Sequence, residues 1–278
     1  MKIQFFAILI LLGLVVNAQD FQGKATYKTH RKFKMNLGGD RQKGQGINTE
    51  MQAKIRAQMM KQFQRTFTLS FTKNESVYKQ NEELEAPQVQ TSGMQIQVSV
   101  SGGGTDVYYK NTAEKRYVNK TEISGKRFLI KDNLEQPKWE MSGETKNIGN
   151  YTCYKATQKR EETRTSFLMT DGEREEKKEK VTVETVAWYT PEIPVSNGPE
   201  RFWGLPGLIL EIQDGDQTIV CSEIVLNPKE KIEIKEPKKG KKVSQEEYGE
   251  IMKKHSEDMM KRFTNQRGSG GTMIFESR

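Results

Sequence analysis

The residues that could do chemistry are few. The chain has only two histidines, His30 and His255, beside many carboxylates. A Ser-His-acid triad would need one of these histidines next to a serine and a carboxylate, and no nucleophile-elbow sequence surrounds any serine. A pair of carboxylates that hydrolyses a glycosidic bond stays open, because Asp and Glu are common and no spacing singles out a pair. We therefore expect a non-catalytic protein without a cofactor.

Potential metal ligands are also poorly spaced for zinc, because no H-x-H, C-x-x-C or H-E-x-x-H sequence occurs. Met252, His255 and Met259 fall close together on a predicted helix, and thioethers with an imidazole suit copper(I). The simpler interpretation is a methionine-rich face that packs against a sheet. We favour packing and keep copper handling as an alternative.

The two cysteines, Cys153 and Cys221, lie in two separate strand-like stretches. In an oxidising compartment they could form a disulfide, which would contribute about 4 kcal/mol by restricting the unfolded chain. Two separate buried thiols are the alternative.

The most informative segment is 188–212, which reads WYTPEIPVSNGPERFWGLPGLILEI. Its four prolines exclude an interior strand or helix over the first part. Large apolar groups in the same segment must nevertheless be buried. We predict a rigid loop folded over the open face or end of a sheet. The loop either plugs that opening as core, which we favour, or forms the wall of a site for an apolar ligand or peptide. The candidate site residues are Trp188, Ile193, Phe202, Trp203, Leu205 and Pro206.

Residue alternation predicts a mainly β (α+β) fold. Phe67, Leu69 and Phe71 point to one face of a strand at 66–72 and hydroxyl residues point to the other, as in an antiparallel sheet with one solvated face. Short strands separated by turn residues follow, so we expect a meander. Charged residues at 161–180 predict a solvated hairpin tip, and Asp214-Gly215-Asp216 predicts a hairpin turn. Met51, Ile55, Met59 and Phe63 recur every four residues and predict one packed helix near 48–64.

The chain divides into five predicted segments. Residues 1–18 read as a signal peptide, with Lys2 before an apolar run and Val16-Asn17-Ala18 at the cleavage site. A β-rich domain follows at 19–228, then a basic linker at 229–243. A C-terminal amphipathic helix at 244–267 begins with a Ser244/Glu247 capping box, and a disordered tail occupies 268–278. We expect export and no transmembrane segment after signal cleavage.

The net charge of +8 comes from interleaved basic and acidic residues rather than one basic block. Such interleaving is typical of a solvated surface, and together with export it argues against nucleic-acid binding.

The hexapeptide Gly204-Leu205-Pro206-Gly207-Leu208-Ile209, with the preceding WYTPEIP and Gly198-Pro199, resembles the GLPGLI family. Gly149 shortly before Cys153 fits the same pattern. The resemblance implies an exported protein of Gram-negative bacteria, periplasmic or associated with the outer membrane, with no assigned catalytic residues. The β pattern is also similar to the unclosed barrels of lipoprotein carriers, which implies a curved antiparallel sheet or unclosed half-barrel.

These observations lead to one function and two alternatives. We expect a non-catalytic envelope protein that binds an apolar ligand or a partner protein within a curved sheet. The first alternative is an interaction module of outer-membrane machinery, with the C-terminal helix and the charged hairpin as contact surfaces. The second is the copper-handling protein described above.

Overall fold

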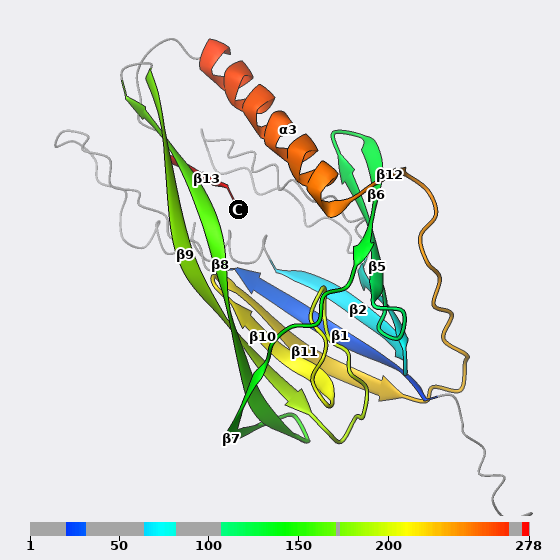
Figure 1. Cartoon of the computed structure of the whole chain (residues 1–278). Helices are drawn as coiled ribbons and strands as arrows, with labels where there is room; N and C mark the ends of the chain where they lie inside the picture. Colours follow the sequence, from blue (N-terminus) through cyan, green and yellow to red (C-terminus); the bar gives the residue numbers. More distant parts are fainter. Residues whose placement is uncertain (1–20, 32–63, 82–106, 171–172, 267–273, 278) are drawn as a thin grey trace, which may run out of the picture.

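A computed structural model describes residues 21–31, 64–81, 107–170, 173–266 and 274–277. These residues form one 13-stranded sheet with the strand order β12-β6-β5-β4-β3-β2-β1-β11-β10-β9-β8-β13, and β7 pairs with β8 beside this path. Figure 1 shows the sheet bent round, with β8 and β9 on one side, β5 and β6 on the other, and β1, β10 and β11 between them. The predicted mainly β fold with an unclosed sheet is confirmed.

The first half of the sheet is a meander. Its strands are β1 (Gln22–Arg31), β2 (Arg65–Thr72), β3 (Glu75–Gln80), β4 (Val107–Asn111), β5 (Arg116–Ile123) and β6 (Lys126–Asn133). The second half contains β7 (Glu140–Ile148), the long hairpin β8 (Tyr151–Thr170) and β9 (Glu173–Thr190), and the hairpin β10 (Leu208–Asp214) and β11 (Gln217–Leu226). Two short strands, β12 (Lys241–Val243) and β13 (Ile274–Ser277), add to the edges. Every pairing is antiparallel except that of β12 with β6.

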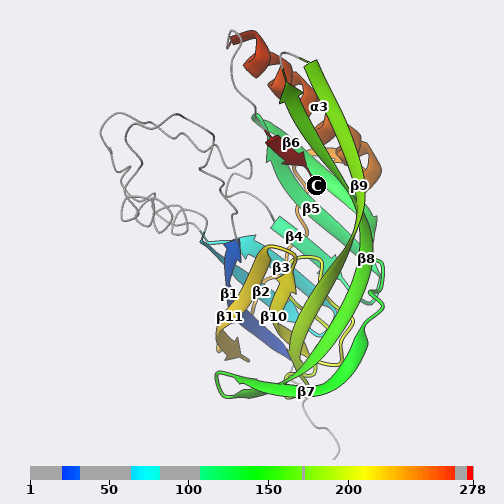
Figure 2. The same ribbon diagram turned by 90° about the vertical axis from the view of Figure 1, so that its left-hand side faces the viewer.

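The predicted alternation in β2 is confirmed. Leu69 and Phe71 are fully buried, and Phe67 packs against the same cluster. Leu69 lies opposite Ala25 of β1 and Tyr78 of β3, so these residues share the inner face of the sheet. This inner face and the segment between β9 and β10 supply the main core, and Figure 2 shows the curve that encloses it.

The C-terminal helix, α3 (Gln245–Gln266), begins with the predicted capping box. Ser244 N donates to Glu247 Oε2 at 2.8 Å, and Glu247 N donates to Ser244 Oγ at 3.1 Å. The first turns pack against the sheet, with Tyr248 edge-on to Phe128 of β6. Met252 and Met259 are 36% and 46% exposed, so the expected packing of a methionine face against the sheet is wrong for these two residues. No helix in the described ranges is long and apolar enough to cross a membrane.

The predicted basic linker at 229–243 is attached to the sheet rather than free of it. Ile232 is buried, and Ile234 packs against a cluster of Tyr109, Val118 and Leu129 on the outer face. Glu236 is held by Arg116 at 2.8 Å and by Lys131 at 2.7 Å. Ile232 and Ile234 alternate with charged residues, and their burial explains why this segment packs along the sheet before it joins β12.

The candidate disulfide is not formed in the structure, which holds Cys153 and Cys221 as buried free thiols. Cys153 lies on β8 and Cys221 on β11, with β9 and β10 between them. Three strand spacings separate them by about 14 Å along the sheet, whereas a disulfide needs Cα atoms less than about 7 Å apart. Burial raises the pKa of Cys153 to about 11 and that of Cys221 to about 12. The signal peptide, the helix near 48–64 and most of the C-terminal tail lie outside the described residues.

The close approach of Gly207 to β9 yields a prediction about stability. A Cβ atom on Gly207 would lie 2.1 Å from the carbonyl oxygen of Thr190, a backbone atom that cannot turn away. We expect Gly207→Ala to lower the free energy of unfolding by about 2–3 kcal/mol, the range of overpacked cores, in urea denaturation. Gly143→Ala is the matched control, because a Cβ there meets nothing within 4 Å. Equal losses in the two variants would contradict this.

Candidate functional site

The segment between β9 and β10, residues 191–207, buries its large apolar side chains inside the curve of the sheet and is called the plug below. Of the candidate site residues, Ile193, Phe202, Trp203 and Leu205 are all buried within the main core or at its border. Trp188 lies on β9, half-buried, with Lys146 Nζ 4.4 Å from its ring centre, and Pro206 is exposed. The structure therefore brings four of the six candidates into the core or to its border.

A buried loop must find partners for its backbone polar groups, since an unpaired group in the core costs free energy. The plug finds several within itself and the adjoining strand. Leu208 N donates to Ile193 O at 3.0 Å, and Ile209 N donates to Asn197 O at 3.0 Å. Gly204 N donates to Ser196 Oγ at 3.1 Å. From the sheet, the Tyr27 hydroxyl donates to Ile209 O at 2.7 Å.

A further partner of the plug backbone is a lysine. Lys110 of β4 is 0% exposed, and its Nζ donates to Gly198 O at 2.6 Å and to Phe202 O at 3.0 Å. Burial lowers the pKa of Lys110 to about 7, although the charge of Glu200 acts to raise it. A neutral amine still has two hydrogens, enough for both carbonyls. Lys110 thus joins the two arms of the plug to the meander half of the sheet.

Two tryptophans connect the plug to the segment between β6 and β7. The indole of Trp139 donates to Trp203 O at 2.8 Å, and the indole of Trp203 donates to Glu135 O at 3.0 Å. Trp139 also lines Gly204, whose φ of +94° suits glycine. Residues 134–139 are therefore held against the plug at the opening of the curved sheet.

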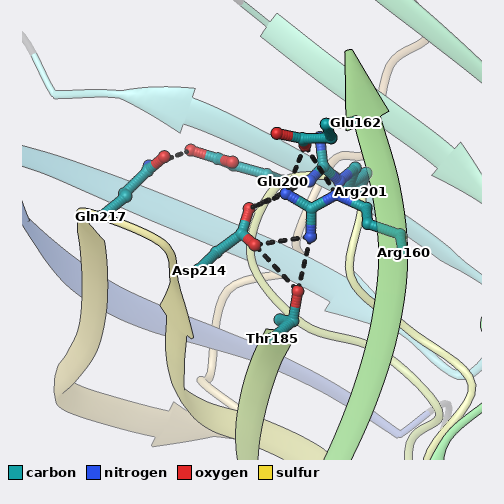
Figure 3. A network of polar contacts seen from close by, with 7 residues as sticks. All are labelled: Arg160, Glu162, Thr185, Glu200, Arg201, Asp214 and Gln217. Carbon is teal, nitrogen blue, oxygen red and sulfur yellow. Dashed lines mark hydrogen bonds and ion pairs between the residues drawn. The ribbon is translucent and has the colours of Figure 1, made fainter. Parts of the chain in front are cut away.

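Above the plug, the inner face becomes polar (Figure 3). Arg160 of β8 binds Asp214 of β10 through two nitrogens, at 2.6 and 3.1 Å, and also contacts Glu162 at 2.7 Å. Thr185 of β9 donates to the same carboxylate at 2.8 Å. Arg201 of the plug adds a further contact to Asp214 at 3.0 Å. One carboxylate thus joins three strands and the plug.

The Asp214 carboxylate is well shielded, with 6% of its side chain exposed. Burial acts to raise its pKa, but the hydrogen bonds from Arg160 and Thr185 and the charges of Arg201 and Arg160 outweigh burial, so the pKa is lowered. Glu200 accepts from Gln217 at 3.0 Å at the border of this cluster. The cluster is largely self-neutralising, which makes it a structural joint rather than an ion site.

Next to this joint is a pocket of about 430 Å³ at the opening of the sheet, called the mouth pocket below. It is lined by residues 133–138 together with Gln158, Lys159, Arg201 and Phe202. Its charged groups are Lys138, Lys159, Arg201 and Glu135. Within the described ranges Lys138 and Lys159 have no ion-pair partner, whereas Arg201 binds Asp214. The pocket therefore offers two free ammonium groups to a ligand.

Sequence reasoning singled out none of the mouth-pocket cations and not Lys110, and it named Asp214 only as part of a hairpin turn. Lys110 carries a weak signal, since it interrupts a strand beside two tyrosines. The three candidate metal ligands, Met252, His255 and Met259, all lie on α3. His255 Nε2 lies 3.5 Å from Ser124 Oγ. Across the described ranges, no group of three or more His, Cys, Asp or Glu side chains could hold a metal ion.

Comparison with known proteins gives one family and a distant structural likeness. Residues 139–211 match a family described as a protein of unknown function, Porph_ging. This match includes the whole plug and the hexapeptide, and it does not test the GLPGLI resemblance. No curated protein matches the chain.

Two structures of PNGF-II, in space groups C2 and P21, are each 12% identical over 83% of this chain with a TM-score of 0.46. The chain spans 32% of the length of those chains. Likeness at this level does not establish a shared function.

The buried lysine gives a pH-dependent prediction. The unfolded chain keeps the Lys110 proton up to about pH 10.5, whereas the folded chain releases it near pH 7. The free energy of unfolding that Lys110 contributes should therefore rise with pH between these values, by at most about 1.4 kcal/mol per unit. We expect the difference between wild type and Lys110→Met in urea denaturation to widen from pH 7 to pH 9.5. Lys126→Met, at an exposed lysine, is the matched control. A flat profile for Lys110→Met would contradict the assignment.

The Asp214 joint gives a second prediction. Asp214→Asn leaves Arg160 with a neutral partner, and we expect it to lower the free energy of unfolding by about 2–3 kcal/mol at pH 7, since breaking a shielded pair is costly. Because the folded pKa is lowered, this advantage of wild type is present above the unfolded pKa and disappears as pH falls through the folded pKa. Denaturation at pH 7 and pH 2.5 measures both. Asp216→Asn, two residues along in an exposed turn, is the control. If Asp214→Asn and Asp216→Asn lower the free energy of unfolding equally, the structural role of Asp214 is refuted.

Proposed function

We propose that this chain is an exported, non-catalytic protein of the bacterial envelope, belonging to the GLPGLI family, that binds a partner protein at the mouth of its curved sheet. The observation that carries the proposal is the mouth pocket. It lies at the opening of the sheet, it has two ammonium groups without an ion-pair partner in the described ranges, and its walls are held by the plug and by Trp139.

The arrangement supports a partner protein better than an apolar ligand. Four of the six residues expected to contact an apolar ligand pack against the core instead. The mouth pocket mixes charged groups with Phe202 and Leu134, as a protein interface with a polar rim does.

The alternative of an interaction module is compatible with the same surface. In Figure 1, α3 and the β8–β9 hairpin both extend beyond the body of the sheet on the same side. The exposed thioethers of Met252 and Met259 on α3 are flexible apolar groups of the kind that adapt to a partner. The helix and the hairpin are therefore suited to extend an interface that begins at the mouth pocket.

Photocrosslinking in the bacterium that makes the protein tests this proposal. A photoreactive residue replaces Gln136, which lines the mouth pocket, or Lys28, an exposed residue on the outer face of β1. We expect a discrete adduct at position 136, with a yield at least about tenfold above that at position 28, because a steady interface buries a defined patch.

The variant Lys138→Glu/Lys159→Glu should abolish the adduct at position 136, since charge reversal opposes an acidic partner. Equal yields at positions 136 and 28, or an adduct unaffected by the reversal, would refute binding at the mouth.

A further inference from the structure

We propose that the partner contributes an extended segment that pairs as an antiparallel strand with the outer edge of β8 at residues 158–164 and places an acidic C-terminal end in the mouth pocket. This inference rests on the proposed function and adds to it the mode of recognition and the chemistry of the partner.

The edge of β8 is open along a defined stretch. Along one edge, β8 pairs with β9 without a register shift from Tyr154 to Thr170. Along its other edge, which we call the outer edge, β8 pairs with β7 only up to Thr157 and with β13 only from Thr165 to Leu168. Within the described ranges, residues 158–164 therefore have no strand on their outer side. Their outward backbone groups are available to an added strand, the basis of recognition by strand addition.

The open stretch has the size and geometry of a strand site. Seven residues extend over about 23 Å at the rise of a β-strand, close to the usual strand length. The stretch contains no proline and no bulge, two devices that commonly protect sheet edges. β7 and β13, which flank it, already pair with this edge in the antiparallel direction. A third segment of the same direction would fill the interval between them.

The direction of pairing determines which end of the guest enters the pocket. An antiparallel guest starts opposite residue 164 and ends opposite Gln158. Gln158 and Lys159 line the mouth pocket, at the point where β7 leaves β8. The last residues of the guest therefore lie beside Lys159 in the mouth pocket, which Lys138 also lines. Two ammonium groups without an ion-pair partner favour an acidic side chain or a terminal carboxylate at this end.

The remaining charge on the edge makes the preference specific. Glu161 is exposed and Glu162 is paired with Arg160, so the far part of the edge is not cationic. A uniformly acidic segment would meet repulsion at Glu161, whereas acids at the C-terminal end meet one carboxylate, Glu135, and the two ammonium groups of Lys138 and Lys159. A second copy of the same edge would oppose its own mixed charges and supply no chain end to the pocket.

A synthetic peptide provides the test, because strand addition draws on the backbone and tolerates a generic sequence. The probe is Val-Thr-Val-Thr-Val-Glu-Glu, with fluorescein at its N-terminus and a free carboxylate, titrated with the full chain in fluorescence anisotropy. The charge control is the same peptide with a C-terminal amide and with both glutamates replaced by lysine. The pairing controls are two isomers of the probe that are N-methylated at alternate residues.

Strand pairing predicts that one N-methyl isomer binds like the parent and the other does not, since only alternate amides face β8. Charge recognition predicts that the lysine peptide binds at least about tenfold more weakly. The variant Lys138→Glu/Lys159→Glu should lose about as much affinity for the acidic probe. The matched reversal Lys24→Glu/Lys28→Glu, on the outer face of β1, should change it by less than about twofold.

The outcomes separate the two proposals. Equal binding of both N-methyl isomers would overturn strand addition while leaving the mouth pocket as a site. No binding of any peptide would overturn this inference, and the in-cell crosslink at position 136 would then stand alone. Loss of that crosslink would overturn the proposed function itself.

Discussion

The constraint on which this structure depends is the need to satisfy the backbone of a loop that lies inside the sheet. Residues 191–207 are shaped by proline and filled with large side chains, so they are driven into the core. Their carbonyl groups then require donors, and the buried amine of Lys110 supplies two of them. Gly207 must lack a side chain because it lies against Thr190 O. The hexapeptide thus contains the glycine that lets this loop pack closely against β9.

The same strands that hold the plug also place the polar mouth. Ala156, Ala187 and Ile212 lie opposite one another across β8, β9 and β10 and form part of the core. Two and four residues farther along, the same face carries Thr185, Asp214 and Arg160 instead. The inner face of the sheet therefore changes from apolar core to charged cluster within two to four residues along each strand. The mouth pocket lies beyond this boundary and includes Arg201, which also binds Asp214.

Local patterns predicted much of the fold. Alternation in β2, the Asp214-Gly215-Asp216 turn and the Ser244/Glu247 cap each depend on neighbours in sequence, and each is found in the structure. The burial of the loop also followed from its composition. The mouth pocket could not be predicted, because Lys138, Lys159 and Arg201 meet only through the curvature of the sheet. The separation of Cys153 from Cys221 depends on strand order, which spacing along the chain does not encode.

Native-state hydrogen exchange of the full chain tests the account most directly, because it reports the plug and the edge of β8 together. The account predicts that the amides of Leu208 and Ile209, bonded to Ile193 O and Asn197 O, exchange only when the whole protein unfolds. It also predicts that alternate amides in 158–164 exchange rapidly, because no strand in the described part of the chain covers them. Rapid exchange throughout the plug, or full protection along the edge, would contradict a sealed core beside an open edge.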